Sequence, residues 1–336
     1  MKLLSEMFKV RSMAMLIPVF YLSTLFVGFA SCAIMVCPPK EDLEPCYCRQ
    51  LAYGLFVGCA NFNSSSSLLK AFKIMREYYM TTVLFHHLYI TDVLPNDLFH
   101  GTYISGVTVN NSTLKFSQPA FTGLDDTLQY LSVLKHSVIK SKDDFILARL
   151  SKLEEFRMAF NHLPKVQDTW LNGKVPNVRT LVLDNNGITE LEIAAFSTLS
   201  QLKSISIANN QIRSVSRSMF SNPAQHLENI DLTNNEIETL PSDFFFNMPY
   251  LKRVFLAENN LRTLQKMTWL PVWENLSDVI LTGNKIVCDK KLEWLKKIRR
   301  ISHLNGDCVA PKEVAGKPIW EVYYEWDSNV MYASII

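Results

Sequence analysis

The stretch that decides the fold is VRTLVLDNNGI, residues 178–188. It fits the pattern L-x-x-L-x-L-x-x-N-x-L, which recurs on both sides of this stretch with one anchor residue per unit. The nine anchors are Leu88, Ser112, His136, Asn161, Asn186, Asn210, Asn235, Asn259 and Asn284. Successive anchors are 24 or 25 residues apart, and this regularity predicts a solenoid of nine stacked coils.

Each coil is expected to begin with a short strand whose inward residues, such as Leu181 and Leu183, pack on the same positions of its neighbours. Parallel strands lie about 4.8 Å apart, so nine of them predict an inner sheet about 40 Å long. The anchor Asn should hydrogen-bond backbone groups of adjacent coils. Because Leu88, Ser112 and His136 have no side-chain amide, we expect the first three coils to be less regular.

A second column follows nine to eleven residues after each of the first eight anchors, and every member is aromatic. It predicts an apolar spine along the outer side of the coil, made by Phe99, Phe121, Phe145, Trp170, Phe196, Phe220, Phe245 and Trp269. With the anchors, this column resembles the signature of extracellular leucine-rich repeats over about two-thirds of the chain. The resemblance implies an α/β leucine-rich repeat solenoid, or horseshoe, with a parallel inner sheet of about nine strands over residues 80–287 and a disulfide-bonded cap at each end.

Residues 1–33 have the three parts of a secretory signal. Lys2, Lys9 and Arg11 precede an apolar centre at residues 14–30, and small residues at 30–33 favour cleavage after Ala33. An uncleaved signal anchor is the alternative, because the stretch is long enough to span a bilayer. In both cases the bulk of the chain is expected outside the cytosol. The cleaved form is predicted to be secreted, extracellular and free of the membrane.

The cysteines gather at the two ends of the chain. Of seven, cleavage would remove Cys32 and leave an even number, with none between Cys59 and Cys288. This distribution predicts caps over residues 34–79 and 288–336, the second including a tail. A zinc site at Cys46 and Cys48 is the less favoured interpretation, because the signal indicates an oxidising compartment.

The leucine-rich repeat resemblance also implies how the cysteines pair. In the N-terminal cap it gives Cys37 with Cys48 and Cys46 with Cys59, one of three connectivities open to four cysteines. Cys288 and Cys308 remain for a single bridge in the C-terminal cap. Between them the sequence predicts an amphipathic helix with Leu292, Leu295 and Ile298 on its apolar face.

Four sequons mark acceptors for N-linked glycans in a secreted chain, at Asn63, Asn110, Asn111 and Asn275. The sequons of Asn110 and Asn111 overlap, so double occupancy is disfavoured. Asn111, which is followed by a threonine, is the favoured acceptor of the two.

Composition and motifs disfavour nucleic-acid binding and catalysis. Without residues 1–33 the chain has 31 basic and 31 acidic side chains, so its net charge gives no footprint for phosphate backbones. The sequence contains no metalloprotease, nucleophile-elbow or phosphate-loop motif. His86 and His87 are adjacent on a strand, so we expect them on opposite faces and not as metal ligands. These observations predict a non-enzyme without cofactors.

The N-terminal cysteine segment, residues 37–59, and the C-terminal one, residues 288–308, resemble those of secreted arthropod proteins named after the non-catalytic subunit of the Oplophorus luciferase (Oplophorus-luciferin 2-monooxygenase). The resemblance implies a secreted non-catalytic binding or scaffolding protein, including an accessory role beside a luciferase-like enzyme. The alternative is a recognition receptor in innate immunity or cell adhesion, soluble or anchored by its N-terminus.

A protein partner is expected on the concave face, because an open curved sheet suits partners of protein size. Aromatic and arginine side chains contribute most binding energy at interfaces, and on this face they concentrate in coils three and four. The predicted patch consists of Tyr130, Leu134, Glu155, Arg157 and Phe160. Whether Phe160 is exposed or folds into the core stays open. Arg253 and Phe255 form a smaller second candidate.

Overall fold

The computed structural model describes residues 36–141, 147–168, 170–171 and 173–324. The predicted signal with its cleavage point, Phe145 of the aromatic column and the end of the C-terminal tail lie outside the described residues. Within the described chain, no helix has both the length and the apolar character needed to cross a membrane.

The N-terminal cap consists of two short helices and two strands, followed by a 3-10 turn. These elements are α1 (Lys40–Leu43), β1 (Cys46–Leu51), β2 (Gly54–Ala60), α2 (Ser65–Ile74) and η1 (Met75–Glu77). β1 pairs antiparallel with β2, so Cys46 stands opposite Cys59, and these two form a disulfide. Cys37 bonds to Cys48, so both pairs are those that the resemblance implies. Buried Leu43 and Phe72 belong to the continuous apolar core that runs on into the coils.

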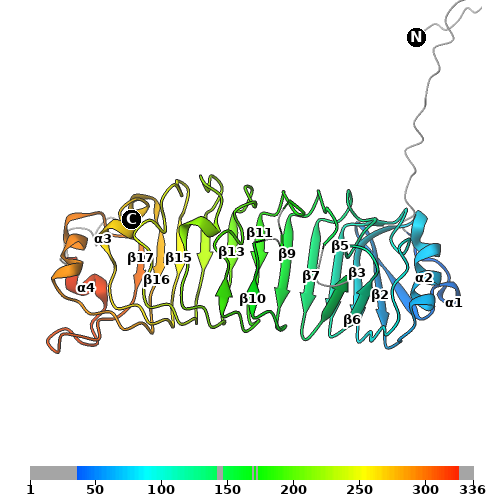
Figure 1. Ribbon diagram of the computed structural model, residues 1–336, viewed down its shortest axis with the longest axis horizontal. Coiled ribbons are helices and arrows are strands. Elements are labelled where there is room, and N and C mark those ends of the chain that lie inside the picture. The colour runs from blue at the N-terminus through cyan, green and yellow to red at the C-terminus, as the bar shows by residue number, and fades with distance from the viewer. Residues whose placement is uncertain (1–35, 142–146, 169, 172, 325–336) are drawn as a thin grey trace, which may run out of the picture. The chain divides into compact units, whose positions relative to one another are not determined.

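The nine predicted repeat strands are present and run parallel in chain order (Figure 1). They are β3 (Tyr79–His86), β5 (Gly106–Asn110), β7 (Tyr130–Leu134), β9 (Glu155–Ala159), β11 (Thr180–Val182), β13 (Ser204–Ser206), β14 (Asn229–Asp231), β15 (Arg253–Phe255) and β16 (Asp278–Ile280). Among the described residues they belong to a 13-stranded sheet that also includes β1, β2, β4 (Tyr103–Ile104) and a last strand, β17 (His303–Asn305). The sheet ends at β1 and β17, so it is not closed into a barrel.

One core runs through all coils because each strand buries its two inward residues. Leu181 and Leu183 are fully buried, and Leu181 stands in register with the buried Phe156 and Ile205 of the neighbouring strands. Short parallel pairs lie after the anchor turns, namely β6 (Thr113–Phe116) with β8 (Val138–Ser141) and β10 (Lys165–Val166) with β12 (Glu190–Leu191). Aromatic rings of successive coils lie near one another, as Phe99 and Phe121 do at 6.0 Å between centroids. Further along, Phe244 completes the spine, because it lies between Phe220 and Phe245.

The anchor asparagines form a hydrogen-bond ladder between coils. The Asn186 amide donates to the carbonyl of Met158 (2.6 Å) and accepts from the backbone N–H of Asn161 (3.0 Å). These bonds satisfy backbone groups that turn away from the sheet. The same arrangement recurs at Asn210, Asn235, Asn259 and Asn284.

The prediction that His136 is an anchor is wrong, because its side chain is exposed and Ser137 takes its place in the ladder. Ser137 is buried, its hydroxyl accepts from the N–H of Ser112, and its own N–H donates to the Asn161 amide (2.7 Å). Lys135 and His136 both adopt positive φ, which lengthens the turn of coil three by one residue. The ladder therefore continues through serines into the first coils, where a side-chain amide is missing.

The C-terminal cap continues the sheet beyond the predicted boundary at residue 287. β17 pairs parallel with β16, and Cys288 and Cys308 form a disulfide. The predicted amphipathic helix is a 3-10 helix, η4 (Lys290–Lys297), which buries Leu292, Trp294 and Leu295; Ile298, the residue after it, is half-buried. The remaining elements are η2 (Arg217–Met219), α3 (Lys266–Trp269), η3 (Trp273–Asn275) and α4 (Ile319–Tyr323).

Candidate protein-binding surface

Alternate residues of every repeat strand lie on the solvent side of the sheet, which we call the open face. Because parallel strands pair in register, these residues form rows across the coils. In one row Tyr130, Glu155 and Thr180 stand opposite one another, and in the next Ser132, Arg157 and Val182 do. Residues far apart in the sequence are thus brought side by side.

Three of the predicted patch residues meet on β7 and β9. Tyr130 exposes 49% of its surface and stands opposite Glu155 on the neighbouring strand. The Nε of Arg157 donates to the carboxylate of Glu155, two residues earlier on the same face. Ser132 and Val182, which flank Arg157, are shorter than the arginine, and the Arg157 side chain is exposed. The arrangement combines an aromatic ring with an ion pair open to solvent.

Phe160 resolves the question left open by its sequence, because 52% of its surface is exposed. Its backbone has φ of 59°, in the left-handed region that bulky side chains rarely adopt. Two hydrogen bonds hold this turn, from the Phe160 N–H to the Asp184 carbonyl and from the His136 N–H to the Phe160 carbonyl. Leu134 stands opposite Ala159, next to Phe160, so the half-exposed leucine adds apolar surface at the same edge.

Asp184 adds a carboxylate beyond the patch at the next coil. Burial raises its pKa, while a hydrogen bond from the Ser206 hydroxyl (2.6 Å) and one from the Ala208 N–H (2.8 Å) lower it. The nearby charge of Asp231 raises this pKa further, and that of Arg157 lowers it. Arg157 therefore lies within the field of two carboxylates, one directly paired and one more remote.

His86 and Asn110 extend the surface toward the N-terminal cap, although neither belongs to the patch that the sequence predicts. They stand opposite one another, and Asn110 also stands opposite Leu134. The Nδ1 of His86 and the Oδ1 of Asn110 are buried and have no hydrogen-bond partner. Burial lowers the pKa of His86 most, followed by the charge interactions with His87 and then with Lys135.

The expectation that His86 and His87 point to opposite faces is wrong. Their rings contact edge to face with centroids 4.0 Å apart. The reason is the left-handed conformation of His87 (φ 53°), which ends the strict alternation at the last strand residue.

The second candidate lies on β15, where Arg253 is exposed and Phe255 is half-buried. Arg253 donates to the side chain of Asn229, and Phe255 stands between Asp231 and Ile280. It has neither a paired carboxylate within its own strand nor an exposed aromatic residue at the following turn. We therefore use it as the control surface.

The four glycan acceptors differ in what surrounds them. Asn63 is exposed and lines a pocket of about 530 Å³ with His87 and Tyr89. The Asn111 amide contacts both of these residues, accepting from the Tyr89 hydroxyl (3.2 Å), and its backbone φ is positive. The exposed Asn275 side chain donates to the carbonyl of Pro249 (3.0 Å). Glycosylation at these sites, and at half-buried Asn110, stays a prediction.

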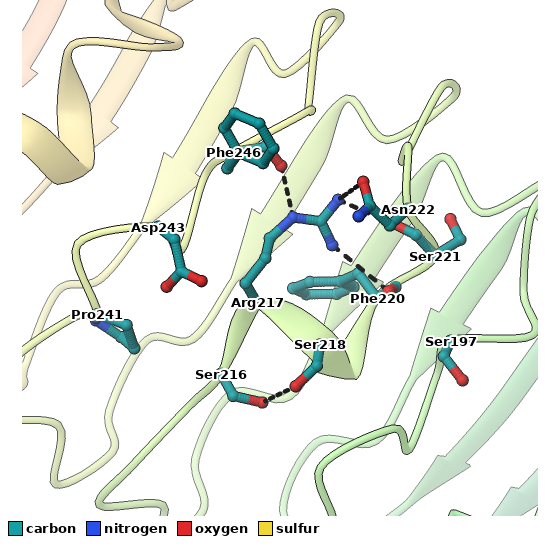
Figure 2. Close-up of a pocket in the computed structure, with 10 residues that line it drawn as sticks. All are labelled: Ser197, Ser216, Arg217, Ser218, Phe220, Ser221, Asn222, Pro241, Asp243 and Phe246. Atoms are coloured by element: carbon teal, nitrogen blue, oxygen red, sulfur yellow. Dashed lines mark hydrogen bonds between the residues drawn. The ribbon is translucent and has the colours of Figure 1, made fainter.

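A further pocket of about 510 Å³ lies at η2, away from the predicted patch, and is drawn in Figure 2. Its central residue is Arg217, which exposes only 6% of its surface. The guanidinium donates to the carbonyls of Phe246 and Ser221 and to the amide of Asn222 (Figure 2). These neutral acceptors occupy most of its donors, so Arg217 joins neighbouring coils instead of presenting a free cation.

Comparison with known proteins supports the leucine-rich repeat fold. A family model described as "Leucine rich repeat" matches residues 176–225 and 225–286. A solved octameric complex of Latrophilin 3 (Lec, Olf), Unc5D (Ig, Ig2, TSP1) and FLRT2 (LRR) contains a similar chain, with a TM-score of 0.58 and 17% identity over 82% of this chain and 90% of that one. At this identity the likeness shows the fold alone. No curated protein matches the sequence, so the resemblance to luciferase subunits stays a prediction.

Proposed function

We propose that this chain is an extracellular, non-catalytic binding protein that holds a protein partner on the open face of its leucine-rich repeat sheet. The patch consists of Tyr130, Leu134, Glu155, Arg157 and Phe160. The observation that carries the proposal is Phe160, whose large apolar side chain is exposed from a left-handed turn. Such strain persists where the surroundings hold it, and it is often associated with function.

The chemistry around Phe160 fits a protein interface. Tyrosine, phenylalanine and arginine are enriched at the centres of interfaces, where they lose water on contact. Arg157 lies on the strand next to that of Tyr130 and three residues before Phe160, and it already has a carboxylate partner, so burying it would not leave an isolated charge. The similarity to FLRT2 concerns the fold. FLRT2 itself is part of a complex with two other proteins.

Three disulfides support the extracellular location, because such bonds persist in oxidising compartments. An N-terminal signal cleaved after Ala33 would release the chain, and Ile34 would then be the first residue found by mass spectrometry of the secreted form. An intact Met1 would instead support the anchored receptor in immunity or adhesion.

The direct test is partner capture from native extracellular fluid by the immobilised chain, with identification of the bound proteins. We expect Tyr130→Ala with Arg157→Ala to weaken capture by about tenfold or more. The circular dichroism spectrum and the melting temperature should not change, because both side chains are exposed. The matched control is Arg253→Ala with Phe255→Ala, which removes the same kinds of side chain from β15.

Two results would contradict the placement or the role. If capture survives the first double change and is lost with the control, the patch lies at the other end of the sheet. If neither change affects capture, the partner does not use the open face. Co-purification of a small catalytic chain would support the accessory role beside a luciferase-like enzyme.

A further inference from the structure

Positive charge is concentrated in the C-terminal cap, although the chain as a whole is nearly neutral. Residues 289–300 contain six basic side chains and two acidic ones, whereas the full sequence has 34 and 32. We call the six the basic strip: Lys290, Lys291, Lys296, Lys297, Arg299 and Arg300. All six side chains are exposed.

The packing of η4 turns these cations outward. Leu292 and Leu295 are fully buried, and the indole N–H of Trp294 donates to the carbonyl of Leu264 (3.1 Å). The Cys288–Cys308 disulfide fixes the segment just before the helix. Because a 3-10 helix rises about 2 Å per residue, Lys290 and Lys297 are separated by about 14 Å along its axis. The exposed lysines are therefore spread along a helix that is held against the core.

Most of the strip has no acidic partner among the residues that the structure describes. Within the described part of the chain, only Arg299 of the six forms an ion pair, with Glu274. One of the two local acids, Asp289, accepts from the Lys291 N–H (2.9 Å) and so caps η4. Lys296 and Arg300 lie over the rings of Tyr323 and Trp320, at 5.9 and 4.8 Å. The other three, Lys290, Lys291 and Lys297, form neither an ion pair nor a ring contact with the described residues.

We propose that the basic strip binds a sulfated polysaccharide. A linear polyanion with fixed sulfate charges complements an extended row of ammonium and guanidinium groups, and clustered Lys and Arg residues attract such polymers through the local field. Anionic lipids are the less favoured ligand, because they concentrate in the cytoplasmic leaflet while disulfide-bonded caps belong to oxidising compartments. The site is separate from the patch on β7 and β9, so the chain would hold a protein and a polysaccharide at different places.

The test measures binding of the full secreted chain to heparin at about 0.15 M salt. The strip variant is Lys290→Gln, Lys291→Gln and Lys297→Gln, which keeps the three cations that pack on aromatic rings or backbone carbonyls. The control variant is Lys70→Gln, Lys152→Gln and Lys203→Gln, three exposed lysines elsewhere. Both variants have the same net charge.

We expect the strip variant to bind heparin about tenfold more weakly or worse, and the control variant to bind like the wild type. Desulfated heparin should bind weakly to all three. Equal weakening in both triple variants would overturn the proposal, because the attraction would then depend on net charge alone. Binding to phosphatidylserine vesicles without binding to heparin would also overturn it and indicate a membrane surface. The Tyr130→Ala, Arg157→Ala variant should retain heparin binding, which separates this proposal from the protein-binding one.

Discussion

Phe160 occupies the same turn position in coil four as Asn185 does in coil five, with φ of 59° and 57°, respectively. Asparagine tolerates the left-handed region, whereas a bulky apolar residue is strained there. Both turns are held by the same type of hydrogen bond, from the residue's N–H to a carbonyl of the next coil. The chain therefore keeps an unfavourable residue at one turn and a favourable one at the equivalent turn.

We predict that Phe160→Asn raises the free energy of unfolding by about 1 kcal/mol, because it relieves this strain and removes an exposed ring. The same change should weaken partner capture, since it deletes the most exposed aromatic residue of the patch. Urea unfolding and the capture assay measure the two effects. A variant that is less stable than the wild type would show that the ring has a packing role.

The serine that replaces an anchor asparagine leads to a second prediction. Ser137→Val should lower the free energy of unfolding by about 1 to 3 kcal/mol, because the buried N–H of Ser112 loses its partner and the carbonyl of Leu134 keeps only the N–H of Asn111. Asn186→Leu should cost a similar amount for the same reason. His136→Leu, one residue away, should stay within about 0.5 kcal/mol, because its side chain is exposed. Equal effects at 136 and 137 would contradict the corrected register.

Comparison of these two neighbours shows what periodicity can and cannot determine. The buried columns are predictable because every coil must repeat its inward residues to bury them. The extra residue in the turn of coil three is not predictable, because spacings of 24 and 25 residues between anchors both occur. In addition, neither Lys135 nor His136 is a residue type that signals a positive φ. β17 was missed for a related reason, since Leu304 is the only buried residue of its three and no full repeat pattern surrounds it.

The site was partly predictable by the same logic. Strand alternation places Tyr130, Glu155 and Arg157 on the open face, because their inward neighbours define the register. The exposure of Phe160 depends on a turn conformation that the carbonyls of an adjacent coil fix, so local sequence left it undecided. The net charge of the chain does not reveal the basic strip, because acidic residues elsewhere in the chain balance its charge.

The C-terminal cap gives a third prediction. Replacing Cys288 or Cys308 by Ser should lower the free energy of unfolding by about 2 to 5 kcal/mol, because the bridge restricts the unfolded chain and holds the cover of the last coil. Thermal melting under non-reducing conditions measures this. Unchanged melting in both variants would mean that the disulfide has no stabilising role in the cap.

His86 gives the last prediction, which concerns pH. Its pKa lies below the usual 6.5, chiefly because burial disfavours the charged imidazolium and because His87 and Lys135 add positive charge nearby. The folded chain therefore holds His86 neutral under conditions in which the unfolded chain already binds a proton there. Since the unfolded state then binds more protons, stability rises with pH across this window and is lost as the pH falls below about 6.5.

We expect His86→Gln to reduce the loss of stability between about pH 7.5 and pH 5.5, because the variant has no imidazole to protonate on unfolding. Urea unfolding at a series of pH values gives the slope directly, and the difference between wild type and variant isolates His86 from the carboxylates. The same substitution at exposed His226 controls for the loss of an imidazole. A slope that is unchanged by His86→Gln would mean that the orphaned Nδ1 gains a solvent partner and titrates as freely in the folded chain as in the unfolded one.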